Sequence, residues 1–199
     1  MYKLKALAQA LIENDDKLIL FNGDGSDYQG QVVNIDKKNV EVLINSKKII
    51  NNESNLNVTL LQALTSNDKM DWIIQKTTEL GISNIQPIIC ERSIVKIKND
   101  KIKKRLFHWQ HVSIAACEQC GRSKIPKINM PEHINKYLEQ ISSSDNSLKI
   151  ILSPTAKKTI NDIHYNSEQN IKVLIGPEGD FSDQELELAI KKYFIPVRI

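Results

Sequence analysis

The stretch that decides the fold is Leu174-Ile175-Gly176-Pro177-Glu178-Gly179-Asp180-Phe181-Ser182-Asp183-Gln184-Glu185. An apolar strand over 171–175 runs into a glycine-proline-glycine loop. A helix then begins, because Ser182 with Glu185 three residues later has the pattern of a capping box. The glycines let the backbone pass close to a ligand or take a positive φ, and the proline stiffens the turn. Ligands of parallel α/β sheets lie beyond the carboxyl ends of the strands, so this loop is a candidate ligand site. A tight strand-to-helix turn without a ligand explains the same spacing.

The composition is that of an ordinary soluble globular protein. The chain has 199 residues, enough for one large domain or two small ones, and 41% of them are hydrophobic. No apolar run approaches the length of a membrane span, and the first residues lack the apolar core of a secretory signal. We therefore expect no membrane partner. The formal net charge of +3 permits an RNA partner without demanding one.

The chain contains three cysteines, Cys90, Cys117 and Cys120. They do not make a disulfide framework, so a reduced cytoplasmic setting is the simplest interpretation. The last two form a C-x-x-C pattern, but a structural zinc site needs four ligands and no second pair follows. His108 and His111 lie nearby in the sequence and leave a mixed site open. We expect no metal.

The first third of the chain predicts β structure. Short apolar or alternating runs, separated by turn residues such as Asn22-Gly23-Asp24-Gly25, are typical of a small antiparallel barrel. The predicted strands cover 17–21, 28–35, 40–44, 49–50 and 56–64. The polar stretch Thr65-Ser66-Asn67 marks a domain boundary. Residues 1–64 are therefore the predicted barrel, and residues 66–199 the predicted second domain.

The rest of the chain alternates helix and strand, as a parallel α/β sheet does. The predicted helices cover 68–80, 100–119, part of 161–170, and 183–192, and the predicted strands cover 84–89, 149–152, 171–175 and 194–197. Gly81 is a fitting residue to end the first of these helices. Within that helix, Trp72, Ile73, Lys76 and Leu80 are predicted to share one face.

Four groups of residues follow one another along this second part of the chain. They are Lys69-Met70-Asp71-Trp72-Ile73-Ile74-Gln75-Lys76-Thr77-Thr78-Glu79-Leu80-Gly81; Glu91-Arg92-Ser93; Ala115-Ala116-Cys117-Glu118-Gln119-Cys120-Gly121-Arg122 with Ile125-Pro126; and Ile175-Gly176-Pro177-Glu178-Gly179 with Phe181-Ser182 and Glu185. Together they resemble the RsmE family of SPOUT methyltransferases, whose members methylate N3 of a uridine in small-subunit ribosomal RNA. One such segment is a weak signal, and four in register are a strong one.

The resemblance implies an α/β fold in which a SPOUT-type knotted parallel-sheet domain follows a small PUA-like β-barrel that helps to hold RNA. In that fold the backbone forms a deep trefoil knot around S-adenosylmethionine, a rare exception to unknotted topology. The implied cofactor is therefore S-adenosylmethionine. The implied partners are 16S ribosomal RNA or the small ribosomal subunit, and a second copy of the chain in a homodimer.

Two features of the family are not found in this sequence. Members begin with an extra β segment and an Arg-rich stretch, whereas residues 1–16 are short and divergent. Members also continue into a Leu-Gly-x-Arg-Ile-Leu-Arg-like segment that wraps the cofactor, whereas this sequence runs to Pro196-Val197-Arg198-Ile199. We therefore expect an incomplete barrel and a cofactor pocket that lacks one wall. The alternative function is a truncated, non-catalytic remnant that binds RNA or dimerises.

Backbone groups in loops can bind the edge of an adenine without help from side chains. Cofactor contact is therefore predicted for two strand-end loops, Leu152, Ser153 and Pro154, and Gly176, Pro177, Glu178 and Gly179. The Glu178 side chain is predicted to contact the ribose or the amine of the cofactor, although a negative charge there also favours the start of the next helix. Leu152 is equally suited to plain core.

Two arginines are the predicted catalytic residues. Loss of the N3 proton of uracil spreads negative charge onto the two flanking carbonyl oxygens, and a guanidinium can stabilise that charge with a fork of donors. Arg92 and Arg122 are predicted to do this or to bind RNA phosphate, and a surface arginine without a role is the alternative for each. The general base stays open between His108, His111, Glu118 and water.

The predicted RNA contacts are Lys76, Arg92, Gln119 and Arg122. A basic run adds Lys96, Lys98, Lys101, Lys103, Lys104 and Arg105, which would bind phosphate with a steep salt dependence or be a solvated helix start. Phe107 and Trp109 could stack bases, but such rings more often pack in a core or interface. An α/β enzyme for another nucleotide is disfavoured, because the sequence has no G-x-G-x-x-G or P-loop.

Overall fold

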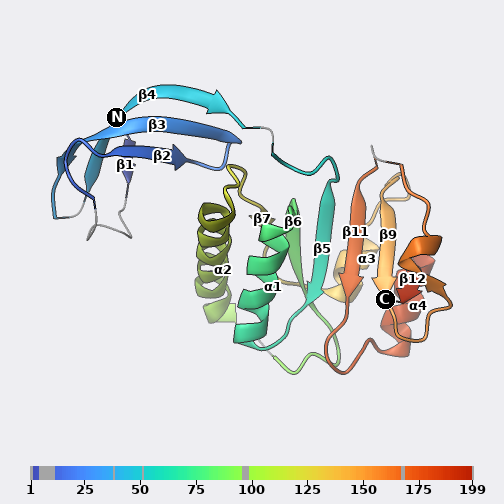
Figure 1. Ribbon diagram of the computed structural model, residues 1–199. Coiled ribbons are helices and arrows are strands. Elements are labelled where there is room, and N and C mark those ends of the chain that lie inside the picture. The colour runs from blue at the N-terminus through green and yellow to red at the C-terminus, as the bar shows by residue number, and fades with distance from the viewer. Residues whose placement is uncertain are drawn as a thin grey trace. The chain divides into compact units, whose positions relative to one another are not determined.

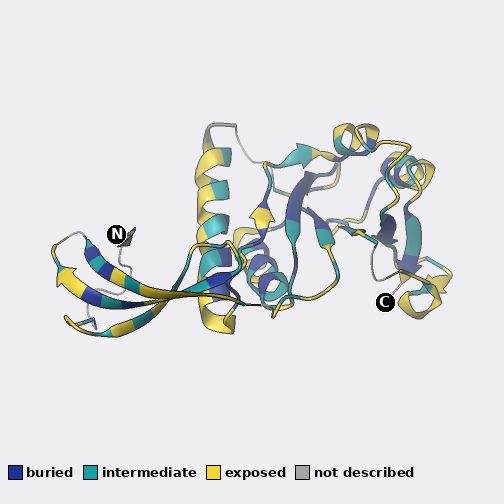
Figure 2. Ribbon diagram, turned by 90° about the horizontal axis from the view of Figure 1, so that it is seen from above, coloured by how far each residue is buried: buried dark blue, intermediate teal, exposed yellow. Residues whose placement is uncertain are grey.

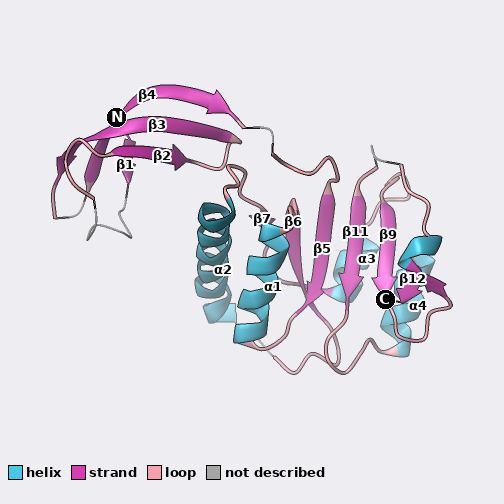
Figure 3. Ribbon diagram, in the orientation of Figure 1, coloured by secondary structure: helices cyan, strands magenta, loops and turns pink. Residues whose placement is uncertain are grey.

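The structure is a computed structural model that describes residues 2–4, 12–37, 39–50, 52–95, 99–166 and 169–198 (Figure 1). The chain divides into two compact units. The N-terminal unit comprises Met1–Glu53 together with Gly121–Ile125, and the C-terminal unit comprises Ser54–Cys120 together with Pro126–Ile199. Figure 3 shows strands without helices in the first unit, and alternating helices and strands in the second.

The N-terminal unit is an antiparallel sheet with the strand order β1-β4-β3-β2. In that order the strands span Tyr2–Leu4, Val40–Ile49, Ser26–Ile35 and Lys17–Phe21. Its core is small and β-branched, with Val32, Val40 and Val42 buried against one another. Among the described residues the sheet is open, with β1 and β2 at its edges.

The C-terminal unit is built on a parallel sheet of eight strands. Its main path is β10-β12-β9-β11-β5-β6-β7, and β8 also pairs with β6. In chain order the strands span Val58–Ala63 (β5), Asn84–Ile89 (β6), Lys127–Ile128 (β7), Glu132–His133 (β8), Leu148–Leu152 (β9), Lys158–Thr159 (β10), Ile171–Ile175 (β11) and Ile195–Arg198 (β12). Every pairing is parallel, so the strands end at one common edge.

The order of the strands creates a switch point between β11 and β5. From β5 the chain passes through α1, Asn67–Glu79, to β6 on one side. From β11 it passes through α4, Asp183–Lys191, to β12 on the other side. The crossovers therefore leave neighbouring strands in opposite directions, which is the place where open α/β sheets bind ligands.

Helices cover both faces of this sheet, as Figures 1 and 2 show together. One face carries α1 and α2, Asn99–Cys120, and the other carries α3, Ile134–Glu139, and α4. Adjacent residues of β5 point to opposite faces, because Leu60 packs with Ile74 of α1 whereas Leu61 packs with Leu138 of α3. The central strands are accordingly buried on both sides (Figure 2).

Most predicted elements of the second domain are confirmed within one or two residues. The structure has α1, β6, α2, β9, β11, α4 and β12 where the sequence predicted them. The predicted helix ends are also confirmed, because Gly81 and Gly121 have φ values of +93° and +74°, as glycines just after a helix usually do.

The prediction for the run 56–64 was wrong, and one short helix was not predicted. The run 56–64 is not part of the antiparallel region, because β5 pairs in parallel with β11 and β6, and the boundary of the two units falls at Glu53 instead of Leu64. An apolar run that is buried on both faces fits a central parallel strand. Within 161–170, helical structure is limited to the 3-10 helix Ile160–Asp162, whereas the short helix α3 was not predicted.

Helix α1 has one buried face and one exposed face. Trp72 and Leu80 are 62% and 82% exposed, while Met70, Ile74 and Thr78 are buried. Three residues at a spacing of four share a helix face, and this face meets the sheet and α2. Of the residues predicted to share one face, Trp72 and Leu80 are exposed, whereas Ile73 is partly buried and packs against the core. No helix in the described ranges is both long enough and apolar enough to cross a membrane.

Candidate functional site

A pocket of about 510 Å³ opens at the carboxyl ends of β9, β11 and β12. We call it the strand-end pocket. It is lined by Leu152, Ser153, Pro154, Ile175, Gly176, Pro177, Glu178, Asp180, Val197 and Arg198. Six of the seven predicted cofactor residues are among them. The seventh, Gly179, lies in the same loop without lining the pocket.

The glycine loop is shaped by close packing. A Cβ atom on Gly176 would lie 2.9 Å from the ring of Phe181, a distance that side chains do not tolerate. The amide of Asp180 donates to the carbonyl of Pro177 over 3.0 Å and closes a tight turn. Positive φ is taken by Asp180, at 61°, and by neither glycine of the loop. The glycine is therefore needed for a close approach of a ring, one of the two uses that the sequence suggested.

The predicted capping box at the start of α4 is confirmed. The amide of Glu185 donates to Ser182 Oγ, and the amide of Ser182 donates to Glu185 Oε2 over 2.9 Å. The buried carboxylate of Glu185 also accepts the amide of Glu91 over 2.8 Å through Oε1. One side chain thus fixes the end of the glycine loop to the turn that follows β6.

Glu178 links the two strands of the switch point. Its Oε1 accepts a short hydrogen bond from the hydroxyl of Thr65, directly after β5, and one from Lys69 Nζ over 3.1 Å. The Thr65 hydroxyl, the backbone amide of Glu178 itself and the Lys69 ammonium lower the pKa of this carboxyl to about 2. The pocket therefore has a permanently negative group at its rim at neutral pH.

Arg92 supports the same loop from outside. Its Nη1 donates to the carbonyl of Gly179 over 3.3 Å and to that of Phe181 over 3.1 Å. The side chain is exposed and follows the carboxyl end of β6. Hydrogen bonds from a charged donor to two carbonyls of one loop hold its shape. A positioning role is thus visible in the structure, and the predicted catalytic and RNA-binding roles stay predictions.

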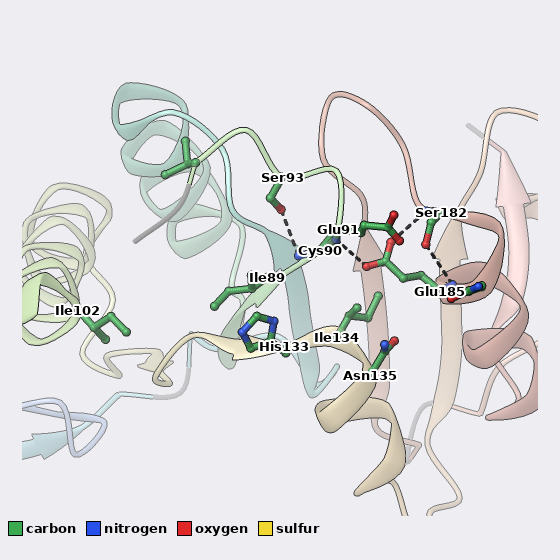
Figure 4. Close-up of a pocket in the computed structure, with 12 residues that line it drawn as sticks. Ile89, Cys90, Glu91, Ser93, Ile102, His133, Ile134, Asn135, Ser182 and Glu185 are labelled. Atoms are coloured by element: carbon green, nitrogen blue, oxygen red, sulfur yellow. Dashed lines mark hydrogen bonds between the residues drawn. The ribbon is translucent and has the colours of Figure 1, made fainter. Parts of the chain in front are cut away.

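A second pocket of about 500 Å³ lies at the carboxyl ends of β6 and β8 (Figure 4). Figure 4 shows Glu185 between the backbone of Glu91 and Ser182, and both Glu185 and Ser182 line this second pocket. Burial, with the nearby Glu185 charge, raises the pKa of the Cys90 thiol to about 12. Cys90 lies in the buried core, as a packing residue does.

Arg122 is not one of the residues that the structure brings to the strand-end pocket. It belongs to the N-terminal unit and is only 6% exposed. Its Nε and Nη2 donate to the two carboxylate oxygens of Glu53 over 3.1 and 2.5 Å, the forked geometry that suits a guanidinium. The next residue, Ser123, accepts the amide of Gly25 through its carbonyl. The segment 121–125 is thus fastened into the first unit.

The remaining predicted RNA contacts lie on helices. Lys76 of α1 pairs with Glu79 over 2.8 Å, and Gln119 is exposed in the last turn of α2. Neither lines the strand-end pocket. Lys96 and Lys98 of the basic run lie outside the described residues, and Trp109 is buried in the core against α1 and β5.

Sequence reasoning missed several residues of the pocket. Asp180 was quoted in the decisive stretch but not assigned, and Val197 and Arg198 were not connected with the site. The positions of Val197 and Arg198 follow from the rule that ligands bind at the carboxyl ends of parallel strands. Since β12 pairs in parallel with β9, its carboxyl end must lie beside Leu152 and Ser153. Thr65 had no local signal, because its partner Glu178 is 113 positions away.

Comparison with known proteins gives a consistent result. A family model for the RNA methyltransferase domain matches residues 52–199, and one for the RNA methyltransferase PUA domain matches residues 12–45. The chain is 35% identical over 188 residues to ribosomal RNA small subunit methyltransferase E of Buchnera aphidicola subsp. Schizaphis graminum, a match that covers 94% of this chain and 75% of that protein.

Two solved structures share the fold. One is a methyltransferase from Legionella pneumophila in complex with the bound cofactor SAM, with a TM-score of 0.86, 37% identity and coverage of 94% of this chain and 76% of that one. The other is ribosomal RNA small subunit methyltransferase E from Neisseria gonorrhoeae bound to S-adenosyl methionine, with a TM-score of 0.85, 33% identity and the same coverage.

Proposed function

This chain belongs to the ribosomal RNA small subunit methyltransferase E family, and from that premise we propose that it transfers a methyl group from S-adenosylmethionine to N3 of a uridine in 16S ribosomal RNA. The observation that carries the proposal is the strand-end pocket. Six residues that the sequence assigned to the cofactor line it, and it lies at the ends of strands on one side of the switch point between β11 and β5.

The lining of the pocket fits this cofactor. Its volume of about 510 Å³ is within the usual range for small-ligand sites. Leu152, Ile175 and Val197 offer an apolar surface for the adenine ring, and backbone groups of the two loops can bind its edge. Glu178 and Asp180 would hold the amine and the sulfonium by negative charge, and Arg198 would hold the carboxylate by positive charge. The pocket thus matches a ligand that carries charges of both signs.

S-adenosylmethionine supplies the methyl group as a carbon bonded to a positive sulfur. The chain itself contributes position and charge. The glycine loop, held by Arg92 and Glu185, fixes the donor side, because alignment of the two reactants accounts for most of the rate in a displacement on carbon. Nε and Nη2 of Arg92 make no hydrogen bond within the described part of the chain, so they are available for an oxygen of the uracil anion.

The proposal includes the partners. The substrate is 16S ribosomal RNA, free or within the small ribosomal subunit, so the enzyme works in the cytoplasm. The second domain is proposed to form the family's knot, and the protein to form a homodimer. A light-scattering mass of twice 22.7 kDa is expected for the purified chain. A mass of 22.7 kDa at micromolar concentration would contradict the dimer and leave the activity to be tested separately.

Calorimetry and a transfer assay test the activity. We expect S-adenosylmethionine to bind the 199-residue chain with a micromolar Kd, on the order of −8 kcal/mol. We also expect transfer of a labelled methyl group to small ribosomal subunits that lack the modification, with N3-methyluridine found in the RNA digest. A folded chain that binds RNA or dimerises but has no affinity for the cofactor would favour the alternative, a non-catalytic remnant.

A further inference from the structure

A third pocket, of about 340 Å³, lies between the first two turns of α1 and the first half of α2. We call it the helix pocket. It is lined by Asn67 and Asp71 of α1, and by Lys101, Lys104, Arg105, His108 and Trp109 of α2. It shares no lining residue with the strand-end pocket. Lys104, Arg105 and His108 follow Lys101 by three, four and seven positions. These four side chains therefore share one face of α2.

The helix pocket is strongly positive. Lys101, Lys104 and Arg105 carry three cations, whereas Asp71 is the one carboxylate in the lining. None of these cations forms an ion pair with another described residue. Asp71 is engaged by His108, over 2.7 Å. Like charges three and four positions apart on a helix repel one another, so a bound anion would stabilise this arrangement.

Exposed aromatic rings flank the helix pocket in sequence. Trp72 follows Asp71 and is 62% exposed, and Phe107 precedes His108 and is 68% exposed. Phe107 touches another side chain, His111, edge to face with 4.4 Å between ring centroids. Proteins that bind single-stranded nucleic acid combine exposed aromatic rings with cations that have no ion-pair partner. Bases stack on the rings, and phosphates pair with the cations.

The start of α1 connects this pocket with the cofactor loop. Lys69 contacts Glu178 of the strand-end pocket, while Asp71 lines the helix pocket. Two residues of a helix span only about 3 Å along its axis. A ligand in the helix pocket would therefore lie at the same level of α1 as Lys69, which contacts Glu178 of the strand-end pocket.

We propose that the helix pocket binds the sugar–phosphate backbone of the RNA substrate, and that Trp72 and Phe107 stack bases of the same single strand. The proposal rests on the proposed methyltransferase function and names a surface by which the substrate is held. The cations act by charge and carry no sequence information, so they contribute affinity and orientation, and the base that reacts is selected elsewhere.

The test is a variant that removes the three cations, K101Q/K104Q/R105Q. Glutamine keeps the length and helix propensity of the side chains. We expect KM for unmodified small ribosomal subunits to rise about tenfold with kcat within about twofold, because binding common to ground state and transition state is lost. With a fluorescent single-stranded RNA 20-mer, the slope of log K against log salt should become shallower by about 2, at about 0.7 for each of three lost contacts. The Kd for S-adenosylmethionine should not change.

Matched single variants distinguish an effect of the helix pocket from an effect of the overall positive charge of α2. Lys103 and Lys104 are neighbouring exposed lysines of α2, and only the second lines the pocket. The proposal expects K104Q to weaken RNA binding more than K103Q, and expects W72A to weaken it with no change of the salt slope. Equal losses for the two lysine variants would assign the effect to the overall field and overturn the pocket.

The outcomes also separate this proposal from the function on which it rests. If the wild-type chain methylates subunits and the triple variant has the same KM, the helix pocket is not an RNA site and the enzyme function stands. If the triple variant keeps RNA affinity but loses the dimer, the pocket binds protein, which overturns the proposal in favour of another partner. Wild-type protein that binds cofactor but neither RNA nor subunits would overturn both.

Discussion

The loop over 176–182 and the segment 121–125 each depend on an arginine, and the two arginines are used in opposite ways. Arg92 is exposed, and one of its nitrogens donates to two carbonyls of the loop. Arg122 is buried, and its fork is filled by the carboxylate of Glu53. Both had been predicted to be catalytic for the same chemical reason.

The difference teaches how to weigh an arginine in a motif. A guanidinium has five donors, and its role is limited by how many are already used within the protein. Arg122 is committed to a carboxylate, and breaking that pair would leave a buried charge without compensation. Arg92 keeps donors that face solvent. The structure thus ranks the two candidates, which the sequence could not do.

The largest effect is expected for Arg122→Ala. Removing one partner of a nearly buried, forked ion pair leaves Glu53 uncompensated, so the free energy of unfolding should fall by about 3 kcal/mol. Chemical denaturation measures this loss. Arg122→Lys should lose less, because one ammonium keeps the charge but not the fork.

Arg122→Ala also tests whether Arg122 has only a structural role. The Kd for S-adenosylmethionine, measured at a temperature where the variant is folded, should stay within about twofold of wild type, a change of less than about 0.5 kcal/mol. A tenfold loss of cofactor affinity with intact folding would return Arg122 to the active site.

The next largest effect is expected for Gly176→Ala. The added Cβ would stand 2.9 Å from the ring of Phe181, so either the ring or the loop must shift. Since the loop lines the strand-end pocket, the Kd for the cofactor should rise about tenfold, or about 1.4 kcal/mol by calorimetry.

Gly179→Ala is the matched control for this prediction. The Cβ of that variant would meet only Arg92, at 3.4 Å, which is ordinary contact, so affinity should stay within about twofold. Equal losses for the two variants would show that the loop needs glycine flexibility and not close packing.

The cofactor loop could be predicted because its signals are local. A strand, a glycine-proline turn and a capping box follow one another within 171–185, and the strand-end rule then makes the turn a site. The helix ends at Gly81 and Gly121 are local in the same sense. The partners of Arg122 and Glu178 are not, because Glu53 is 69 positions and Thr65 is 113 positions away.

The errors have the same origin. The run 56–64 reads as a buried strand in either kind of sheet, and its assignment to the parallel sheet depends on pairing with β11 more than a hundred residues later. The basic run of α2 was visible, but which of its members face a pocket depends on how α1 packs against that helix. Lys103 and Lys104 are indistinguishable in sequence.

A smaller effect is expected for Arg92→Ala. Two hydrogen bonds from an exposed charged donor are lost, so the cofactor Kd should rise about fivefold, or about 1 kcal/mol. If Arg92 also stabilises the uracil anion, kcat should fall by more than that factor, and Arg92→Lys should recover binding better than turnover. If Arg92→Ala has the Kd and the kcat of the wild type, Arg92 neither holds the loop for cofactor binding nor takes part in the reaction.

The smallest effect is expected for Glu178→Gln. Its effect on stability should depend on pH, and this dependence tests the role of the loop residue Glu178. The pKa of this carboxyl is about 2 in the folded chain and ordinarily 4.5, so its ionised form stabilises the fold above pH 4.5. That stabilisation is lost as pH falls from 4.5 toward 2. The stability difference between wild type and variant should therefore be constant from pH 7 to 5 and shrink below, as followed by urea denaturation.

Asp24→Asn is the control in the other unit. The pKa of Asp24 is also lowered to about 2, chiefly by the Tyr28 hydroxyl and then by Lys47. Its ionised form likewise stabilises the fold, and that stabilisation should be lost as pH falls from 3.8 toward 2. Only Glu178→Gln should also weaken cofactor binding at pH 7, because Glu178 lines the strand-end pocket whereas Asp24 belongs to the N-terminal unit. If both variants weakened cofactor binding equally, the effect could not be assigned to the place of Glu178 in the strand-end pocket.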